Sequence, residues 1–199
     1  QNINKIPKVI AVSKTFKIDK ILPLIDYGHL DYGENKVQEA IEKWSDIKAN
    51  KKDIKLHLIG KLQSNKTKFA VEIFDYIHSL DSEKLAKKIA DEQKKQNKNI
   101  KLFIQVNIGN EDQKSGISKS QLEDFFNFCK KLNLNIIGLM CIPPQDKDPR
   151  EYFKEMNILK QKLNLQELSM GMSSDYLQAI NFSSTFLRIG SNIFGARDY

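Results

Sequence analysis

The side chain best placed for covalent chemistry is Lys14, which directly follows the apolar run VIAVS at residues 9–13. A lysine at the end of a buried strand is partly removed from water, and desolvation disfavours the ammonium form of a lysine and lowers its pKa. The neutral amine is a nucleophile, and with an aldehyde it forms a Schiff base. A lysine in this place can equally lay its apolar stem along the protein and keep its charge in water. Position alone leaves both interpretations open.

Two segments rich in glycine and serine near the end of the chain could hold an anion. In RIGSNIFG at 188–195, Gly190 permits a close approach to the backbone, and Ser191 offers a hydroxyl and an N–H group where a short helix is expected to begin. Ser173, in SMGMSSD at 169–175, can supply a second hydroxyl. Each segment alone is compatible with ordinary turn chemistry. Their joint occurrence favours a phosphate ligand.

Arg188 lies two residues before Gly190, so its side chain shares a strand face with the end of that strand. A guanidinium buried on an inward face needs a hydrogen-bond partner. Such a group can donate to the ring nitrogen of a ligand, and because arginine keeps its own proton, that nitrogen would stay unprotonated. A structural salt bridge is the alternative interpretation.

The elements that must position these residues alternate regularly. Short apolar runs typical of buried strands occur at 9–13, 30–33, 56–60, 76–80, 102–108, 136–142, 168–171 and 186–190. Amphipathic stretches typical of helices lie between them, at 18–27, 35–48, 65–74, 82–95, 119–132, 150–163 and 174–181. This order predicts a parallel sheet covered by helices, either open and doubly wound or closed into a barrel.

Eight strand-like runs favour closure, and no G-x-G-x-x-G follows the first run, as a dinucleotide-binding sheet would require. We therefore expect an α/β fold, a single (β/α)8 barrel of the TIM type. Its connections must be short, because such barrels usually take about 250 residues and the chain has 199. In this fold the chemistry lies at the C-terminal ends of the strands. Lys14, Ser173 and Gly190 all follow strands, so we expect them to meet there.

The histidines give a weaker signal. His78 lies within an expected strand and could approach the site, whereas His29 and His57 are expected to be structural or exposed. The sequence shows no Ser-His-Asp arrangement, no paired catalytic carboxylates and no spacing typical of a metal site.

The net charge of +7 raises the question of nucleic-acid binding. Arginine forks usually read phosphates and bases, yet only Arg150, Arg188 and Arg197 are arginines among 32 basic residues. The lysines alternate with acidic residues, so we expect a solvated surface and no nucleic-acid partner. No segment is apolar enough for a membrane helix, and Cys129 and Cys141 fit neither a disulfide framework nor a metal motif. A cytoplasmic protein is the simplest expectation.

Ordered segments along nearly the whole chain carry a family resemblance. They are AVSKT (11–15), YGENKVQE (32–39), HLIGKLQSNK (57–66), IHSLDS (77–82), IQVNIGNEDQKSGI (104–117), GLMCIPP (138–144), LSMGMSSD (168–175) and RIGSNIFGARDY (188–199). With these segments the chain resembles the pyridoxal phosphate homeostasis protein family, whose members are similar to the N-terminal domain of alanine racemase. A single AVSK would carry little weight, but the ordered set is highly specific.

The resemblance implies one pyridoxal 5'-phosphate-binding barrel over residues 1–199, with the cofactor held as a Schiff base on Lys14. It also implies a set of further cofactor contacts, with Arg188 at the pyridine nitrogen and serine and glycine groups at the phosphate: Asn35, Ser173, Arg188, Gly190 and Ser191. Members of the family are thought to store or deliver the cofactor and so to balance vitamin B6 and amino-acid pools, without a robust catalytic activity. Apo-enzymes that need the cofactor are the implied acceptors, and a monomer is expected.

One departure that matters and two alternatives accompany this resemblance. Family members usually carry an N-terminal helix, and only Gln1–Pro7 precede the first strand here, so this helix is expected to be short or missing. The C-terminal β-domain of related racemases is not expected either, because Tyr199 follows the last strand closely. A pyridoxal-phosphate-dependent amino-acid racemase is the alternative function, with Tyr32 or His78 as an internal second base. A Schiff-base aldolase acting on a sugar phosphate is a weaker one.

Overall fold

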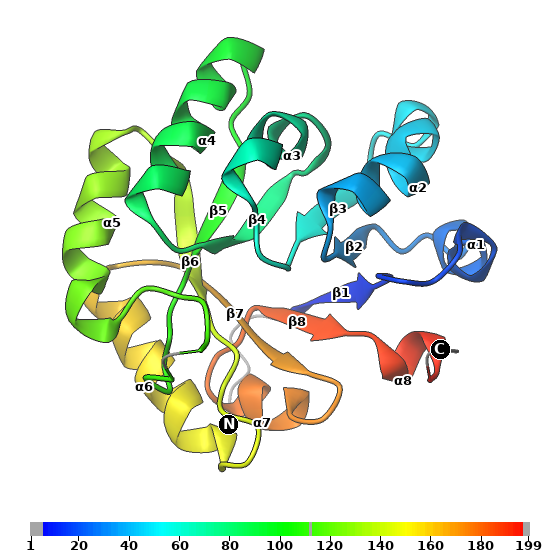
Figure 1. Ribbon diagram of the computed structural model, residues 1–199. Helices are drawn as coiled ribbons and strands as arrows, with labels where there is room; N and C mark the ends of the chain where they lie inside the picture. Colours follow the sequence, from blue (N-terminus) through cyan, green and yellow to red (C-terminus); the bar gives the residue numbers. More distant parts are fainter. Residues whose placement is uncertain (1–5, 112, 197–199) are drawn as a thin grey trace.

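The chain folds into a closed barrel of parallel strands surrounded by helices, in a computed structural model that describes residues 6–111 and 113–196 (Figure 1). Within the described residues the strands pair in sequence order, and the last strand pairs with the first to complete the ring. They are β1 (Lys8–Val12), β2 (Asp31–Glu34), β3 (Lys55–Leu58), β4 (Tyr76–Leu80), β5 (Lys101–Gln105), β6 (Ile136–Met140), β7 (Glu167–Met172) and β8 (Phe186–Ile189). The predicted TIM-type barrel is confirmed.

The helices lie outside the ring of strands, where each returns the chain to begin the next parallel strand (Figure 1). They are α1 (Ile18–Asp26), α2 (Val37–Asn50), α3 (Thr67–Ile73), α4 (Glu83–Gln96), α5 (Leu122–Lys131), α6 (Pro149–Lys162), α7 (Tyr176–Asn181) and α8 (Ser191–Phe194), with short 3₁₀ turns at Ser64–Lys66 and Lys119–Gln121 before α3 and α5. All seven expected helices are present, and α8 is the short helix expected after the last strand.

Local chemistry explains several helix starts. The Ser82 hydroxyl accepts the Leu85 N–H at the beginning of α4, and the Asp148 carboxylate accepts the Arg150 N–H at the beginning of α6. Pro149 occupies the first turn of α6, where its missing N–H costs nothing. These are the start signals that the sequence carries, so the boundaries of α4 and α6 agree with expectation.

Three strands, β3, β5 and β6, end two or more residues earlier than the sequence suggests, and β5 and β6 show what ends them. The run 102–108 was expected to be one strand, but β5 ends at Gln105, and the next residue forms an isolated bridge to Ile117 instead. The run 136–142 stops at Met140 because Pro143 and Pro144 follow and cannot donate to a sheet ladder. In both cases the freed residues contribute to the loops at the C-terminal end of the barrel.

The barrel interior is filled by side chains rather than open. A buried cluster of Ile10, Tyr76, Phe103, Met140 and Phe186 occupies it, supplied by five different strands. A larger apolar cluster lies between the strands and the surrounding helices. The interior therefore forms a packed floor beneath the C-terminal ends of the strands.

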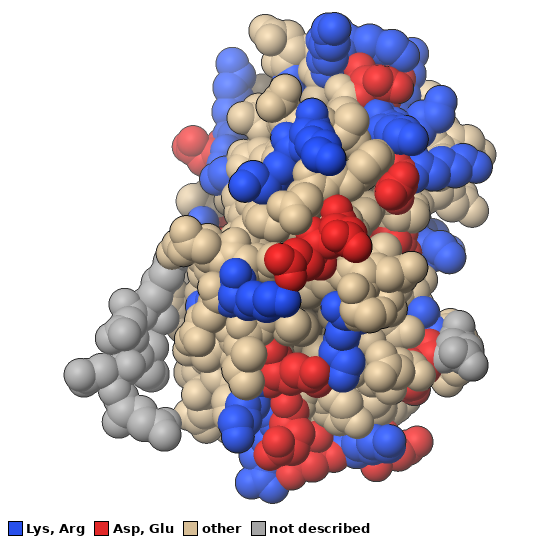
Figure 2. Space-filling view, turned by 90° about the vertical axis from the view of Figure 1, so that its left-hand side faces the viewer, with Lys and Arg blue, Asp and Glu red and all other residues tan. Residues whose placement is uncertain are grey.

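The surface carries charges of both signs. On the face toward α5, lysine side chains lie beside acidic ones (Figure 2), and Lys119–Glu155 and Lys162–Glu123 pair there. None of the helices in the described residues combines the length and apolar character that a membrane span requires. The expectation of a short or missing N-terminal helix concerns the chain before β1, of which residues 1–5 lie outside the described residues, as do 197–199 at the other end.

Candidate functional site

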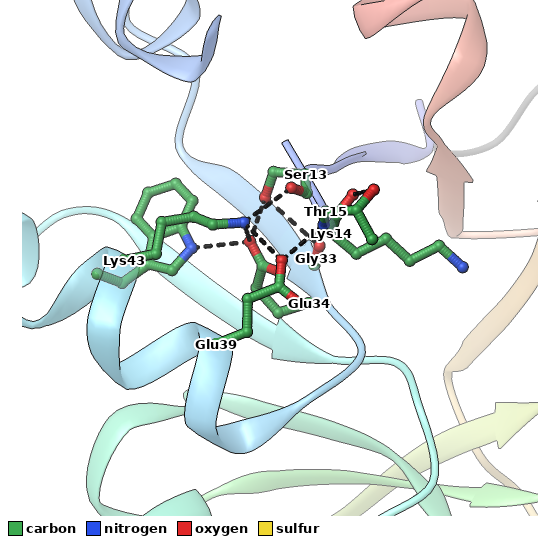
Figure 3. Close-up of polar contacts among 8 residues, drawn as sticks. Ser13, Lys14, Thr15, Gly33, Glu34, Glu39 and Lys43 are labelled. Atoms are coloured by element: carbon green, nitrogen blue, oxygen red, sulfur yellow. Dashed lines mark hydrogen bonds and ion pairs between the residues drawn. The ribbon is translucent and has the colours of Figure 1, made fainter. Parts of the chain in front are cut away.

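Lys14 lies just beyond the end of β1 and is half-buried. Its neighbour Ser13 is fully buried and continues the pairing of β1 with β2, because its N–H donates to the Gly33 carbonyl at 3.0 Å. Figure 3 shows the Lys14 side chain extended away from the polar cluster that surrounds Ser13. The polar cluster holds the backbone next to Lys14, and the Lys14 amine points away from that cluster.

The centre of that cluster is the buried carboxylate of Glu34, the last residue of β2. One of its oxygens, Oε1, accepts three hydrogen bonds: from Ser13 Oγ at 2.7 Å, from Lys43 Nζ at 3.0 Å and from Trp44 Nε1 at 2.9 Å. Burial raises the pKa of Glu34, although Lys43 and these hydrogen bonds act against that shift. A carboxylate this well supplied with donors ties β1, β2 and α2 together beside Lys14.

Lys43 and Glu39, both on α2, extend the cluster to the residue after Lys14. The Lys43 ammonium donates to the Ser13 carbonyl at 2.9 Å and to Glu39 at 2.9 Å (Figure 3). Glu39 in turn accepts the Thr15 N–H at 2.6 Å. Thr15 has a φ of 69°, a left-handed conformation that costs a non-glycine residue energy. The cluster therefore holds a strained turn in place around Lys14.

The two loops expected to bind phosphate lie together. The Gly190 N–H donates to Ser173 Oγ at 3.3 Å, and the Asn192 side chain donates to the Ser173 carbonyl at 3.3 Å. Ser191 is exposed as the first residue of α8. A Cβ added at Gly190 would lie 3.5 Å from Val12, an ordinary contact, so packing within the protein does not require glycine there. A glycine that the packing does not require suits the close approach of a ligand to its backbone.

Arg188 is buried in the barrel interior, as its spacing from Gly190 predicts. Its guanidinium donates to the Ser169 carbonyl and to Ser169 Oγ, both at 2.6 Å, and to the Cys141 carbonyl at 2.8 Å. Burial lowers the pKa of Arg188 from its usual value. An arginine has five N–H donors, so these three bonds leave two N–H groups without a partner among the described residues. The structural salt bridge considered for Arg188 is not formed with any described residue.

Asn35 lines a cavity of about 340 Å³ at the C-terminal ends of the strands, together with Gly60, Lys61 and Asn107. Gly60 was not singled out from the sequence, yet a Cβ there would come within 2.3 Å of the Asn35 carbonyl oxygen. Glycine at this position therefore allows the Asn35 backbone to approach β3. The available sequence signal was a glycine at the end of the apolar run 56–60.

Tyr32 and the three histidines are each engaged in packing or hydrogen bonds within the fold. Tyr32 packs against Trp44 of α2, with ring centroids 4.7 Å apart, and so faces the helices rather than the barrel interior. His57 and His78 are fully buried inside the barrel, and both ring nitrogens of His78 have partners. His29 contacts the Asp31 carbonyl at 2.9 Å. Among the described residues there is no group of three or more side chains that could hold a metal ion.

Sequence reasoning missed three residues that hold the site: Glu34, Lys43 and Ser169. Glu34 carried a signal, because a carboxylate that ends a buried strand needs a partner. Lys43 and Ser169 carried none, since lysine on a helix and serine in a strand are common.

A protein-family comparison matches residues 1–198 to the alanine racemase N-terminal domain. A curated relative, the pyridoxal phosphate homeostasis protein of Vibrio alginolyticus, is 38% identical over 96% of this chain and 87% of its own. The chain belongs to the pyridoxal phosphate homeostasis protein family.

Solved structures of a family member superimpose closely on the barrel. PipY of Synechococcus elongatus PCC7942, determined without PLP, gives a TM-score of 0.88 at 35% identity and covers 95% of this chain and 93% of its own. The structure of the same protein with PLP bound gives a TM-score of 0.86 at 34% identity and covers 95% of this chain and 92% of its own. The barrel thus shares its fold with family members over nearly its whole length.

Proposed function

We propose that this protein binds pyridoxal 5'-phosphate at the C-terminal end of its barrel and serves in the homeostasis of that cofactor. The observation that carries the proposal is the contact between the loops after β7 and β8, where the Gly190 N–H meets Ser173 Oγ beside the end of β1 that bears Lys14. Lys14 would offer an amine to the aldehyde of the cofactor, and the two loops would offer N–H and hydroxyl groups to its phosphate. Arg188 would offer an N–H donor to its pyridine nitrogen. The relative named as a pyridoxal phosphate homeostasis protein and the PipY structure with PLP bound support the same assignment.

The residues present fit the cofactor. Ser173, Gly190 and Ser191 would hold the phosphate through hydroxyl and N–H groups, and Asn35 would line the site. Arg188 would donate one of its spare N–H groups to the pyridine nitrogen. When bound, the cofactor supplies an aldehyde, which Lys14 would hold reversibly as a Schiff base.

The chain's own residues favour holding over turnover. Arg188 cannot give up its proton, so a ring nitrogen facing it stays unprotonated, and this makes the pyridine ring a poor electron sink. Tyr32 faces the helices, and His78 is engaged at both ring nitrogens, so we assign neither as a second base for racemisation. A reversible hold fits the delivery of cofactor to apo-enzymes, which would link the protein to vitamin B6 and amino-acid pools.

One spectroscopic experiment tests the proposal. Purified protein incubated with pyridoxal phosphate should absorb in the violet, and borohydride should bleach that band and leave a reduced adduct on the peptide that contains Lys14. Lys14→Ala should abolish both signals, whereas Lys17→Ala, which removes an exposed lysine of the same loop, should leave them intact. An adduct on another lysine, or an unchanged spectrum in Lys14→Ala, would contradict the proposal.

A further inference from the structure

A continuous chain of hydrogen bonds crosses the barrel interior from the proposed cofactor site toward the opposite end. Arg188 Nη1 lies 2.6 Å from Ser169 Oγ, which lies 2.8 Å from His78 Nδ1. His78 Nε2 lies 3.0 Å from His57 Nδ1, and His57 Nε2 lies 3.0 Å from Asp31 Oδ1. The five residues come from β8, β7, β4, β3 and β2, so only closure of the barrel brings them together.

The first four members are shielded from water, and the last reaches it. Ser169, His78 and His57 are fully buried and Arg188 is 4% exposed, whereas the Asp31 side chain is 16% exposed. Asp31 is the first residue of β2, so it lies at the N-terminal end of the barrel. This series of hydrogen bonds therefore links the buried Arg188 cation, beneath the proposed cofactor site, to the half-buried Asp31 carboxylate at the other end of the barrel.

The two ends fix the direction of every bond between them. A guanidinium can only donate and a carboxylate can only accept. With both rings neutral, His57 must donate from Nε2 to Asp31 and accept at Nδ1 from His78. His78 then donates from Nε2 and accepts at Nδ1 from the Ser169 hydroxyl. The Ser169 oxygen is left with its lone pairs for Arg188.

The surroundings keep both rings neutral. Burial lowers the pKa of His57 and of His78, and the cationic Arg188 lowers that of His78 further. Asp31 and Asp75 act on His57 in the opposite direction, and Lys8 acts with burial. Tyr76 stacks on His57 and Phe103 on His78, each at 4.2 Å between ring centroids, so apolar ring faces complete the surroundings.

We propose that Asp31, His57, His78 and Ser169 are positioning residues, forming a one-way hydrogen-bond relay that fixes the orientation of Arg188 toward the ring nitrogen of the cofactor. The role of Arg188 at that nitrogen rests on the proposed function, but the direction of the relay does not. Because Arg188 pairs with no carboxylate among the described residues, the relay supplies the oriented acceptor that this buried cation needs. A reversed relay would make Ser169 accept from His78 as well as from Arg188 and would leave its hydroxyl proton to find another partner.

Nitrogen NMR of histidine-labelled, ligand-free protein reads the direction. At neutral pH we expect His57 and His78 both to carry their proton on Nε2 and none on Nδ1. In Asp31→Asn the amide can accept or donate, so the preference of both rings should weaken. Asp26→Asn removes the same charge from an exposed carboxylate that pairs with Lys51 and takes no part in the relay, and should change neither ring. A His78 protonated on Nδ1 in the wild-type protein would overturn the relay.

The positioning role is read on the cofactor itself. His78→Phe cuts the relay but keeps a ring stacked on Phe103. Tyr76→Phe keeps the ring that stacks on His57 and removes only a hydroxyl that takes no part in the relay. With ring-labelled pyridoxal phosphate, we expect the nitrogen resonance to shift and affinity to fall about tenfold in His78→Phe alone, the loss of roughly one positioned hydrogen bond.

Each outcome of these measurements has a distinct meaning. An unchanged nitrogen resonance in His78→Phe, or an equal change in Tyr76→Phe, would refute the positioning role. If His78→Phe fails to fold, Asp31→Asn and Asp26→Asn provide the same comparison on the cofactor. If no variant and no wild-type protein binds the cofactor, the proposed function fails, while the histidine spectra still decide the direction of the relay.

Discussion

Two polar networks flank the proposed site, and they differ in charge and in how the chain assembles them. The cluster around Glu34 uses full charges and joins residues 4 to 30 positions apart, all from the end of β1, the turn after it, β2 and α2. The relay from Arg188 to Asp31 runs through neutral rings, and its His78–Ser169 bond joins residues 91 positions apart. The first network is nearly local, whereas the second exists only once the barrel is closed. The difference implies that the two should fail in different ways.

The largest effect should come from breaking the charged cluster. Lys43→Met would leave the Glu34 carboxylate buried without its cation, and should lower the free energy of unfolding by about 3–5 kcal/mol. Urea denaturation measures this change. Lys51→Met removes a lysine whose ion pair with Asp26 is exposed, and should cost less than about 1 kcal/mol. Equal losses in the two variants would show that the Glu34 pair does not hold the site.

A smaller effect should follow from removing one acceptor in the relay. Ser169→Ala deprives the Arg188 guanidinium of a hydroxyl and should cost about 1.5–3 kcal/mol, the usual range for a hydrogen bond to a charged group. Ser184→Ala is the matched change, because its buried hydroxyl donates to the Met170 carbonyl, a neutral partner. We expect about 0.5–1.5 kcal/mol for it by thermal or urea unfolding. A larger cost for Ser184→Ala would reverse the comparison.

The two histidines of the relay and the Glu34 carboxylate should respond to acid in opposite directions. His57 and His78 have their pKa lowered in the fold, so the unfolded chain takes up protons first, and stability falls as pH drops below the usual histidine value of 6.5. Glu34 has its pKa raised, so protonation in the fold adds stability as pH falls toward its usual value of 4.5.

Unfolding curves measured across this pH range separate the two contributions. His78→Phe should flatten the acid loss by up to about 1.4 kcal/mol per pH unit, whereas Glu34→Gln should steepen it by removing the opposing gain. Identical pH profiles for wild type and His78→Phe would mean that His78 is not held neutral.

The smallest effect concerns the strained turn at Thr15. Thr15→Gly relieves the left-handed backbone at φ 69° but loses the hydroxyl bond to the Lys14 carbonyl and frees the unfolded chain. These terms oppose one another, so we expect a change in stability within about 1 kcal/mol. Adduct formation at Lys14 should nevertheless slow, because the turn is less fixed, and a stopped-flow record of the violet band would show it. An unchanged rate would indicate that the Glu34 cluster alone orients Lys14.

The comparison also explains which parts of the site could be read from the sequence. Lys14, Ser173 and Gly190 follow apolar runs, and in a barrel all such positions converge at one end, so the periodicity and the rule of the fold were enough to bring them together. Glu34 was visible as an acid at a strand end. Its partner Lys43 was not, because one lysine of a helix resembles the others until the helix is docked.

The sequence by itself determined the order of strands and helices, the closure of the barrel and the end at which Lys14, Ser173 and Gly190 lie, because these follow from local periodicity and from the uniform direction of parallel strands. Only the tertiary structure decided that Arg188 is held by Ser169 rather than by a carboxylate, and that two histidines complete a path to Asp31. Inward-facing side chains from distant strands meet according to register and ring orientation, and neither is encoded in the spacing of residues along one strand.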